Sequence, residues 1–325
     1  MLGRMLGIGL FGGRVMLVDE ATGEVRWAVQ AHAGTQSTTC VASGRFLASS
    51  GGADENWKLW DAASGAVLMV GARHGTGACI CEVDNFVHRL VQEGCPEVAH
   101  TAVIGDLAFS PCGRRFASGD LDGAVILWDI QTGGVEHRMQ GHRHGVASLS
   151  FSADGERLAC GCGDGSICIW EMTIGRLLRT IPRQSSVISM VNFSPTDSRA
   201  LATLGHNLLR LVDVESGEMI KSFEAHVFLV FSPDGCTIAT ASAGGACDVL
   251  LVDVESGAVR LRLVGHLGYV SAATFSVEDG STIASGSHDG TCKVWDSSTG
   301  ALLRTIDVGD MICSVVSGRD WVRDT

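Results

Sequence analysis

Apolar and polar residues alternate along short stretches of this chain, and residues that favour turns separate the stretches. In the segment 265–296, GHLGYVSAATFSVEDGSTIASGSHDGTCKVWD, apolar side chains recur at Val270, Ala272 and Phe275, and the turn sequence 288–290 precedes a last apolar run. Alternation with a period of two residues, interrupted by glycine-containing turns, is typical of antiparallel β-strands. The pattern therefore predicts an all-β chain of short strands.

This segment is the clearest of several related repeats. Its terminal dipeptide has counterparts whose acidic residues are separated by 40 to 43 residues, apart from one interval of 68. The seven dipeptides are Val18-Asp19, Trp60-Asp61, Trp128-Asp129, Trp170-Glu171, Val212-Asp213, Val252-Asp253 and Trp295-Asp296. Regular self-similarity indicates one structural unit per repeat. The repeats account for nearly all 325 residues, so we expect a single domain over 1–325, with an insertion at 72–99 between the second and third repeats.

The Gly265-His266 start and the Trp295-Asp296 end of the repeat resemble the WD-repeat β-propeller family. The resemblance covers essentially the whole chain, with four repeats close to the pattern and three that depart from it. It implies a seven-bladed β-propeller whose blades are four-stranded antiparallel sheets. The chain begins inside a blade, and we expect the tail segment 311–316 to supply the missing inner strand. Pairing of this C-terminal strand with the N-terminal blade would close the ring and remove exposed sheet edges.

Composition narrows the range of partners. The formal net charge is −12 and no basic run exceeds two residues, which argues against direct nucleic-acid binding. Most of the twelve cysteines lie within strand patterns, as expected of free thiols in a reduced, cytoplasmic or nuclear setting. The apolar start, MLGRMLGIGLFGG, is short and glycine-rich, so we expect a strand there and not a targeting signal. No segment has the roughly 18 apolar residues of a membrane span.

A histidine, a hydroxyl or thiol, an aspartate and a tryptophan recur in register in four repeats, and we call each such set a tetrad. The tetrads are His32, Ser50, Asp54 and Trp60; His100, Ser118, Asp122 and Trp128; His142, Cys160, Asp164 and Trp170; and His266, Ser285, Asp289 and Trp295. Serine, histidine and aspartate together suggest a catalytic triad. An active site is normally built once, however, and this set is repeated, so we expect a structural role and no enzyme activity.

The family resemblance gives the tetrad a structural role. It implies that the aspartate accepts a hydrogen bond from the histidine, the histidine bonds the hydroxyl, and the hydroxyl accepts from the tryptophan indole. Each buried polar group is thereby satisfied. Cys160 departs from the pattern, and because a thiol is a weak partner we expect a weaker chain in the fourth repeat. The fifth and sixth repeats lack parts of the pattern, and we expect them to be the least stable.

The insertion at 72–99 contains further potential metal ligands. The group is Cys79, Cys81, His88 and Cys95, with His100 just beyond. The paired spacing typical of zinc ligands is absent, and His100 belongs to a tetrad, so we expect no metal site. The helical spacing of apolar residues instead predicts a short amphipathic helix that packs on the ring or docks a partner. Because no Walker-type loop, HExxH or GxSxG sequence is present, we expect no cofactor.

The resemblance also implies a binding surface. Propellers of this family usually act through the face that carries the connections into the inner strands and those between the second and third strands. The positions that correspond in this chain are Tyr269, His288, Leu267, Arg143, Val103, Leu121 and Thr35. Tyr269 is the only tyrosine, and an amphipathic ring at such a place either anchors a partner or simply covers its blade.

The function implied by the resemblance is that of a non-enzymatic scaffold or adaptor, itself a monomer, that binds a peptide or protein within a multiprotein complex. The alternative is a substrate-recognition or regulatory propeller of a larger enzyme assembly, such as a ubiquitin ligase receptor or a signalling protein. Adaptors of one ligase class often have arginine two residues after Trp-Asp, where this chain has Ala63, Gln131 and Ser298. A propeller hydrolase using Ser285 is a third hypothesis, which the repetition of the tetrad disfavours.

Overall fold

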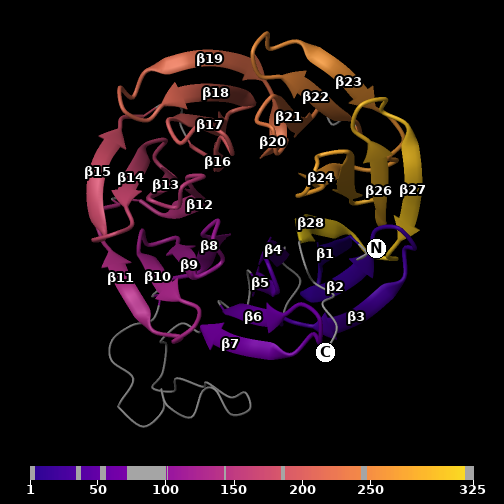
Figure 1. The fold of residues 1–325 in the computed structure, drawn as a ribbon, viewed down its shortest axis with the longest axis horizontal. Helices are drawn as coiled ribbons and strands as arrows, with labels where there is room; N and C mark the ends of the chain where they lie inside the picture. The colour runs from indigo at the N-terminus through magenta and orange to yellow at the C-terminus, as the bar shows by residue number, and fades with distance from the viewer. Residues whose placement is uncertain are drawn as a thin grey trace.

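The computed structural model describes residues 4–33, 38–51, 56–71, 100, 102–142, 144–183, 187–242 and 247–318. In this part of the chain, 28 strands form seven four-stranded antiparallel sheets. The sheets are arranged as blades around a common axis, with one strand of each blade innermost (Figure 1). This confirms the expected all-β, seven-bladed propeller.

The blades follow the repeats in order, and each blade runs from an inner strand to an outer strand. From the inner edge outward, blade 1 contains β28 (Ile312–Gly318), β1 (Met5–Leu10), β2 (Arg14–Asp19) and β3 (Val25–Gln30); blade 2 contains β4 (Thr38–Ser43), β5 (Phe46–Gly51), β6 (Trp57–Asp61) and β7 (Val67–Gly71); blade 3 contains β8 (Ile104–Phe109), β9 (Arg115–Asp120), β10 (Val125–Asp129) and β11 (Val135–Met139). Blade 4 contains β12 (Val146–Phe151), β13 (Arg157–Cys162), β14 (Ile167–Glu171) and β15 (Arg176–Ile181); blade 5 contains β16 (Met190–Phe193), β17 (Ala200–Gly205), β18 (Leu208–Asp213) and β19 (Met219–Glu224). Blade 6 contains β20 (His226–Phe231), β21 (Thr237–Ala241), β22 (Val249–Asp253) and β23 (Val259–Leu263); blade 7 contains β24 (Val270–Phe275), β25 (Thr282–Ser287), β26 (Thr291–Asp296) and β27 (Leu302–Asp307).

The hydrophobic core is divided among the contacts between blades. The described part of the chain has seven clusters of buried apolar side chains, and each cluster combines residues of two neighbouring blades. Between blades 6 and 7, for example, Leu251 of β22 packs in one cluster with Phe275 of β24 and Trp295 of β26. A sheet of four short strands cannot bury enough apolar surface alone, so each blade depends on its neighbours.

Strand β28 closes the ring, as the sequence predicts. It pairs antiparallel with β1, from Met5 opposite Gly318 to Leu10 opposite Ile312. The side chain of Ser314 also reaches blade 2, where its hydroxyl donates to the Thr38 carbonyl at 2.8 Å. A Cβ at Gly9 would lie 2.5 Å from Ser314 Oγ, so this close approach requires glycine. The C-terminal strand therefore holds blades 1 and 2 together.

Side chains also join the inner strands of neighbouring blades. Asp106 Oδ2 accepts a hydrogen bond from the Leu149 amide at 2.8 Å, and Ser148 Oγ accepts one from the Val191 amide at 3.1 Å. These contacts link blade 3 to blade 4 and blade 4 to blade 5. Because they satisfy backbone donors at the inner edges of the blades, they fix the positions of adjacent blades as well as adding to their packing.

Two repeats that depart from the pattern keep their four strands, blade 5 with a changed turn and blade 6 with an irregular inner strand. In blade 5, His206 and Asn207 have φ values of 50° and 59°, and they form the two-residue connection between Gly205 and Leu208. Positive φ at both residues is the requirement of a tight hairpin turn, which takes the place of an Asp-Gly turn. In blade 6, β20 begins at His226, and Val227 has a φ of 72°.

Some of the residues singled out in the sequence lie beyond the described ranges. The predicted helix and the potential zinc ligands of the insertion 72–99 lie outside the described residues, as do Thr35, Asp54 and Arg143. In the ranges that the structure covers, no helix is long and apolar enough to span a bilayer.

A buried side chain at the closure tests the role of β28. Ile312 has no exposed surface and packs with Ile8 and Val294, so Ile312→Ala should lower the free energy of unfolding by about 2 to 5 kcal/mol. The matched control is Leu303→Ala on β27, whose side chain is exposed and whose loss should change stability by no more than about 0.5 kcal/mol. Urea unfolding measures both. Equally small losses would show that β28 contributes little to closure.

Candidate functional site

The tetrad of blade 7 is a continuous chain of hydrogen bonds that joins β25, β26, the turn between them and the connection before β24. His266 Nδ1 lies 2.9 Å from Asp289 Oδ2 and its Nε2 lies 2.8 Å from Ser285 Oγ. Trp295 Nε1 donates to the same hydroxyl at 2.8 Å. A carboxylate can only accept, so Nδ1 carries the proton, and the Ser285 hydroxyl donates to Nε2. All four side chains that the sequence groups together in this repeat are thus joined.

Burial determines what this tetrad can do. Burial lowers the pKa of His266, and this effect outweighs the opposing effect of Asp289. Burial alone would raise the pKa of Asp289, but hydrogen bonds from the Thr291 hydroxyl, the Leu267 amide and His266 together hold it well below its usual range. The Ser285 side chain is 0% exposed. A neutral histidine bonded to an inaccessible hydroxyl stabilises the blade and offers no nucleophile to a substrate.

Blade 3 has the same chain with a different aspartate. His100 Nε2 lies 2.6 Å from Ser118 Oγ, and Trp128 Nε1 donates to that hydroxyl at 2.9 Å. His100 Nδ1, however, bonds Asp120 Oδ2 at 2.8 Å, so the prediction of Asp122 is wrong. Asp120 is the last residue of β9 and is completely buried, while Asp122 lies in the exposed turn. The buried carboxylate is the one that needs buried donors, and it takes the histidine.

Blade 2 uses Ser49, and the prediction of Ser50 is wrong. His32 Nε2 lies 2.8 Å from Ser49 Oγ, and Trp60 Nε1 donates to Ser49 at 2.9 Å. Successive side chains of a strand point to opposite faces, so a shift of one residue moves the hydroxyl to the wrong side of the sheet. Ser49 is opposite Lys58, two residues before Trp60, as Ser285 is opposite Lys293 in blade 7. The shared serine is therefore found from the tryptophan: it is the residue opposite the one two positions before the tryptophan. The sequence identifies it only when the length of the turn between the two strands is known.

The tetrad predicted for blade 4 does not form. Trp170 Nε1 donates directly to His142 Nε2 at 3.1 Å, and His142 Nδ1 lies 2.9 Å from the carbonyl oxygen of Gly123. Asp164 Oδ1 instead accepts from the Ser166 hydroxyl at 2.6 Å and from the Ser166 amide at 3.0 Å. Cys160 occupies the place of the hydroxyl and is a poor acceptor for an indole N–H. The indole therefore bonds the histidine, and the aspartate is satisfied within its own turn.

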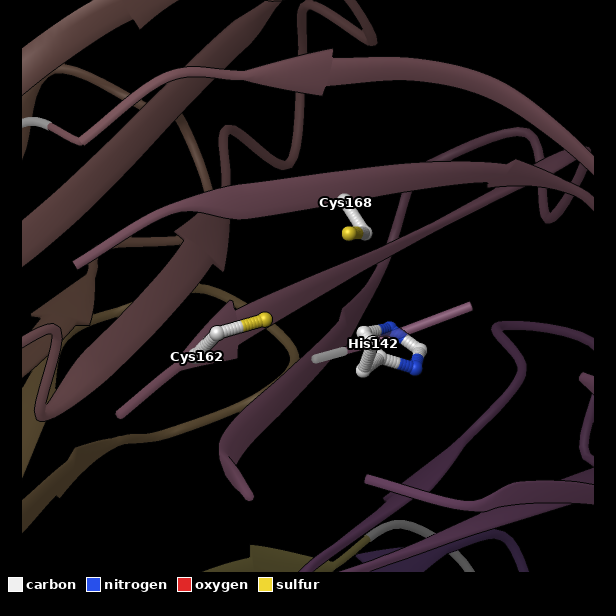
Figure 2. A group of neighbouring side chains, drawn as sticks. All are labelled: His142, Cys162 and Cys168. Atoms are coloured by element: carbon white, nitrogen blue, oxygen red, sulfur yellow. The ribbon is translucent and has the colours of Figure 1, made fainter. Parts of the chain in front are cut away.

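This rearrangement brings three potential ligands together in blade 4. A ring nitrogen of His142 and the sulfur atoms of Cys162 and Cys168 all lie within 4.8 Å of one another, and Figure 2 shows the two thiols on adjacent strands with the imidazole beside them. The hydrogen bond between the thiols lowers the pKa of Cys168, with a further contribution from His142, and raises that of Cys162. Sequence reasoning missed this group. The sequence did contain one indication of it. Cys162 follows Cys160 by two residues, so both side chains point to the face of the strand on which the tetrad hydroxyl is expected.

The two connections that the resemblance assigns to the binding face lie side by side, and we call this face the upper face. The same backbone hydrogen bond joins them in three blades. The amide of Leu121 donates to the carbonyl of Val103 at 2.9 Å, and the amide of His288 donates to that of Tyr269 at 2.8 Å. Gly163 and Gly145 make the corresponding bond in blade 4 at 2.9 Å.

Two exposed apolar side chains of the upper face, Leu267 and Tyr269, belong to one connection of blade 7, and we call Leu267, Tyr269 and His288 the blade-7 patch. Leu267 is 91% exposed and Tyr269 is 43% exposed. The rings of Tyr269 and His288 are 5.2 Å apart between centroids. The Leu267 amide donates to Asp289 Oδ2 at 2.8 Å, so the tetrad fixes the backbone that presents this side chain.

The remaining predicted surface residues do not join the patch. Val103 is half-buried and Leu121 is exposed, and both belong to blade 3, which blades 1 and 2 separate from blade 7. Thr35 and Arg143 fall outside the described residues. The predicted set therefore contains one compact group, on blade 7, and a separate pair, on blade 3.

Comparison with known families agrees with the geometry. Four segments of the chain, 94–129, 133–171, 217–247 and 257–296, match the family model of the WD domain, G-beta repeat. The chain contains four WD repeats and folds as a seven-bladed β-propeller. The matched segments contain the inner strands of blades 3, 4, 6 and 7, and three of them begin with the outer strand of the preceding blade. The strands that complete the seven blades come from sequence before, between and after these segments.

The relatives of this WD-repeat propeller resemble it over a few repeats only. It is 36% identical over 85 residues to the small ribosomal subunit protein RACK1y of Oryza sativa subsp. japonica, which is 26% of this chain and 25% of that protein. It is 34% identical over 97 residues to WD repeat-containing protein 1 of Gallus gallus, which is 29% of this chain and 15% of that protein. The alignments span a quarter or less of each relative. They support the presence of the repeat in this chain, but they do not indicate which partner it binds.

Two aspartates of blade 3 provide a matched test of the tetrad. Asp120→Ala leaves His100 Nδ1 and the amides of Asp122 and Ala124 without their carboxylate acceptor. An unsatisfied buried donor costs about 1 to 3 kcal/mol, so we expect a loss of at least about 2 kcal/mol in unfolding free energy. Asp122→Ala, in the same turn, should cost well under half as much. Urea unfolding of both variants checks this, and a larger loss for Asp122→Ala would contradict the hydrogen-bond pattern.

The lowered pKa of His266 predicts a pH dependence of stability. The unfolded chain gains a proton at this histidine as the pH falls below about 6.5, whereas in the fold burial, with a smaller contribution from Lys293, disfavours the charged form despite the opposing effect of Asp289. The contribution of His266 is therefore present above that pH and is lost as the pH falls. His266→Asn should be less stable at pH 7.5 but should lose less stability between pH 7.5 and 5.5 than the unmodified protein. Urea unfolding across this range tests it, and equal losses would contradict it.

Proposed function

We propose that this propeller is a non-enzymatic scaffold or adaptor that binds a peptide or protein partner at the blade-7 patch of its upper face. The observation that carries the proposal is the exposure of Leu267, which is 91% exposed on a connection whose backbone is held by Asp289. A single exposed apolar side chain is ordinary on a protein surface. An exposed leucine beside a paired tyrosine and histidine is a small amphipathic surface of the kind that anchors a partner.

The rigidity of the patch favours binding. Asp289 accepts hydrogen bonds from His266 and from the Leu267 amide, and the His288 amide is bonded to the Tyr269 carbonyl. Both connections are thus ordered before any partner arrives. Preorganised contact residues lose less conformational freedom on association, so more of their contact energy appears as affinity.

The chemistry of the tetrads supports binding over catalysis. The hydroxyl of Ser285 is fully buried and already bonded to Trp295 and His266. A similar arrangement serves blades 2 and 3, where the shared hydroxyls are also buried. Repeated, inaccessible sets of this kind support a structural framework, with function at the surface.

A role within a larger assembly follows from the same reasoning. One relative is named as a small ribosomal subunit protein, that is, as a component of a multiprotein particle. We place this chain likewise in a multiprotein complex, in the cytoplasm or nucleus. A regulatory or substrate-recognition role within an enzyme assembly would use the same patch, and the identity of the bound partner distinguishes it from a pure scaffold.

The test uses matched substitutions on one blade. Leu267→Asp combined with Tyr269→Ala removes the apolar part of the blade-7 patch, whereas Leu303→Asp places the same charge on the exposed outer strand β27. Partners captured from cell extract by the unmodified chain are identified, purified and titrated against both variants. Loss of the two anchors should weaken affinity at least roughly 30-fold, as hot-spot residues do, and the control should bind normally.

The outcome that contradicts the proposal is a purified partner that binds the double variant and the unmodified chain equally. Circular dichroism and thermal unfolding of each variant show beforehand that the fold is intact. A photo-reactive residue introduced at position 269 adds a direct readout, because it should cross-link to the partner, while the same residue at position 303 should not.

A further inference from the structure

The His142–Cys162–Cys168 group lies beside the position at which the other described tetrads have their shared hydroxyl. In blades 2, 3 and 7 a serine accepts from the tryptophan indole, but blade 4 has Cys160 at this position and Trp170 bonds His142 instead. Cys162 and Cys168 are 1% and 3% exposed, and His142 is half-buried. The hydrogen bonds of this blade do not require two thiols beside the imidazole, so we asked what else these three side chains can bind.

We propose that His142, Cys162 and Cys168 bind a zinc ion that connects the strands of blade 4. The ligand spacing of a zinc motif is absent from the sequence, because the three residues meet only through the pairing of β13 with β14 and the position of the connection before β12. Thiolate sulfur and imidazole nitrogen are the ligands that Zn²⁺ prefers in proteins.

The separations suit the ion after a small adjustment. Zinc–sulfur bonds of about 2.3 Å and zinc–nitrogen bonds of about 2.0 Å at tetrahedral angles place ligand atoms roughly 3.5 to 3.8 Å apart. All three ligand atoms already lie within 4.8 Å of one another. Binding would therefore draw the ligand atoms of the three side chains, which Figure 2 shows as neighbours, together by up to about 1 Å.

The tautomer of His142 is the one that a zinc ligand needs. Because Trp170 Nε1–H donates to His142 Nε2, this nitrogen carries a lone pair and Nδ1 carries the proton. Nδ1 then donates to the Gly123 carbonyl at 2.9 Å. Metal-binding histidines characteristically donate their second nitrogen to a carbonyl or carboxylate, which orients the ring. The Nε2 lone pair accepts a hydrogen bond in blade 4 as it does in blades 3 and 7, so zinc would have to displace the Trp170 indole from His142.

Charge balance favours a divalent ion. Two thiolates and a neutral imidazole neutralise Zn²⁺, whereas a monovalent ion would leave a net negative charge next to the apolar side chains of Leu149 and Met172. The three protein ligands leave a fourth position, and the half-buried side of His142 is where water could occupy it.

A disulfide is a poorer use of the same two thiols. Cys168 is directly opposite Cys160, while the Cys162 amide bonds the carbonyl of Ser166, so Cys162 and Cys168 are diagonal neighbours. Diagonal residues in an antiparallel pair are about 7 to 8 Å apart between Cα atoms, beyond the usual 4.4 to 6.8 Å of a disulfide. A bridging ion spans the longer distance.

The experiment uses the full chain, purified in its reduced form and stripped of metal. Zn²⁺ is titrated in competition with a chromophoric chelator, and Co²⁺ is titrated separately because thiolate coordination gives it a distinct absorption band. The substitutions are Cys162→Ala, Cys168→Ala and His142→Gln, each removing one ligand. Cys160→Ala is the matched control, since Cys160 is a buried cysteine on the same strand whose sulfur is outside the group.

We expect one equivalent of Zn²⁺ in the unmodified chain and in Cys160→Ala, with affinity reduced at least about 100-fold in the three ligand variants. Zinc should raise the unfolding temperature only where it binds, because the ion links three segments of blade 4 in the folded state alone. Binding should also change the emission of Trp170, whose indole loses its acceptor on His142, and Trp170→Phe identifies that signal.

Three results would overturn the proposal. The first is the absence of stoichiometric zinc binding by the unmodified, reduced chain. The second is zinc that survives removal of Cys162 and Cys168, which would place the ion at other cysteines of the chain. The third is tight binding of Cu⁺ but not Zn²⁺ by the same three residues, which would assign the group to a monovalent ion.

Discussion

The apolar contact between neighbouring blades is the constraint on which the rest of the structure depends. Each described cluster of buried side chains belongs to two blades, so no blade has a complete core of its own. A ring in which every sheet needs both neighbours must be closed, and the chain closes it by pairing β28 with β1. The packing of Ile312 between blades 7 and 1 is the local form of that requirement.

Burial of apolar surface also buries the polar groups of the tetrads, and blades 3, 4 and 7 satisfy them in different ways. Blade 7 joins His266 to Asp289 and Ser285, and blade 3 makes the same chain with Asp120. Blade 4 has no shared hydroxyl, so Trp170 bonds His142 directly. In each solution the histidine and the indole have hydrogen-bond partners, which is why one architecture tolerates them all. In blade 4 the thiols of Cys162 and Cys168 lie beside this histidine, and these three side chains are the ones proposed to have another role.

Framework and surface are coupled at blade 7. Asp289 accepts from the buried His266 and also from the amide of the exposed Leu267. The carboxylate that holds the strands together therefore also fixes the backbone from which the proposed anchor projects. This coupling explains how a residue with a structural role affects recognition, and it makes the control variants on β27 necessary to separate the two effects.

The sequence by itself determined the repeat, the strand alternation, the number of blades and the closure by the C-terminal strand, because period and turn chemistry are local properties that recur. It also indicated which residue types would meet in each blade. Only the tertiary structure decided which individual residue is used: Asp120 in place of Asp122, Ser49 in place of Ser50, and Cys162 with Cys168 beside His142. Turn length and strand register set these choices, and a shift of one residue reverses the direction of a side chain. The sequence alone does not determine the strand register to within one residue, because the register depends on turn length and on how the blades pack against one another.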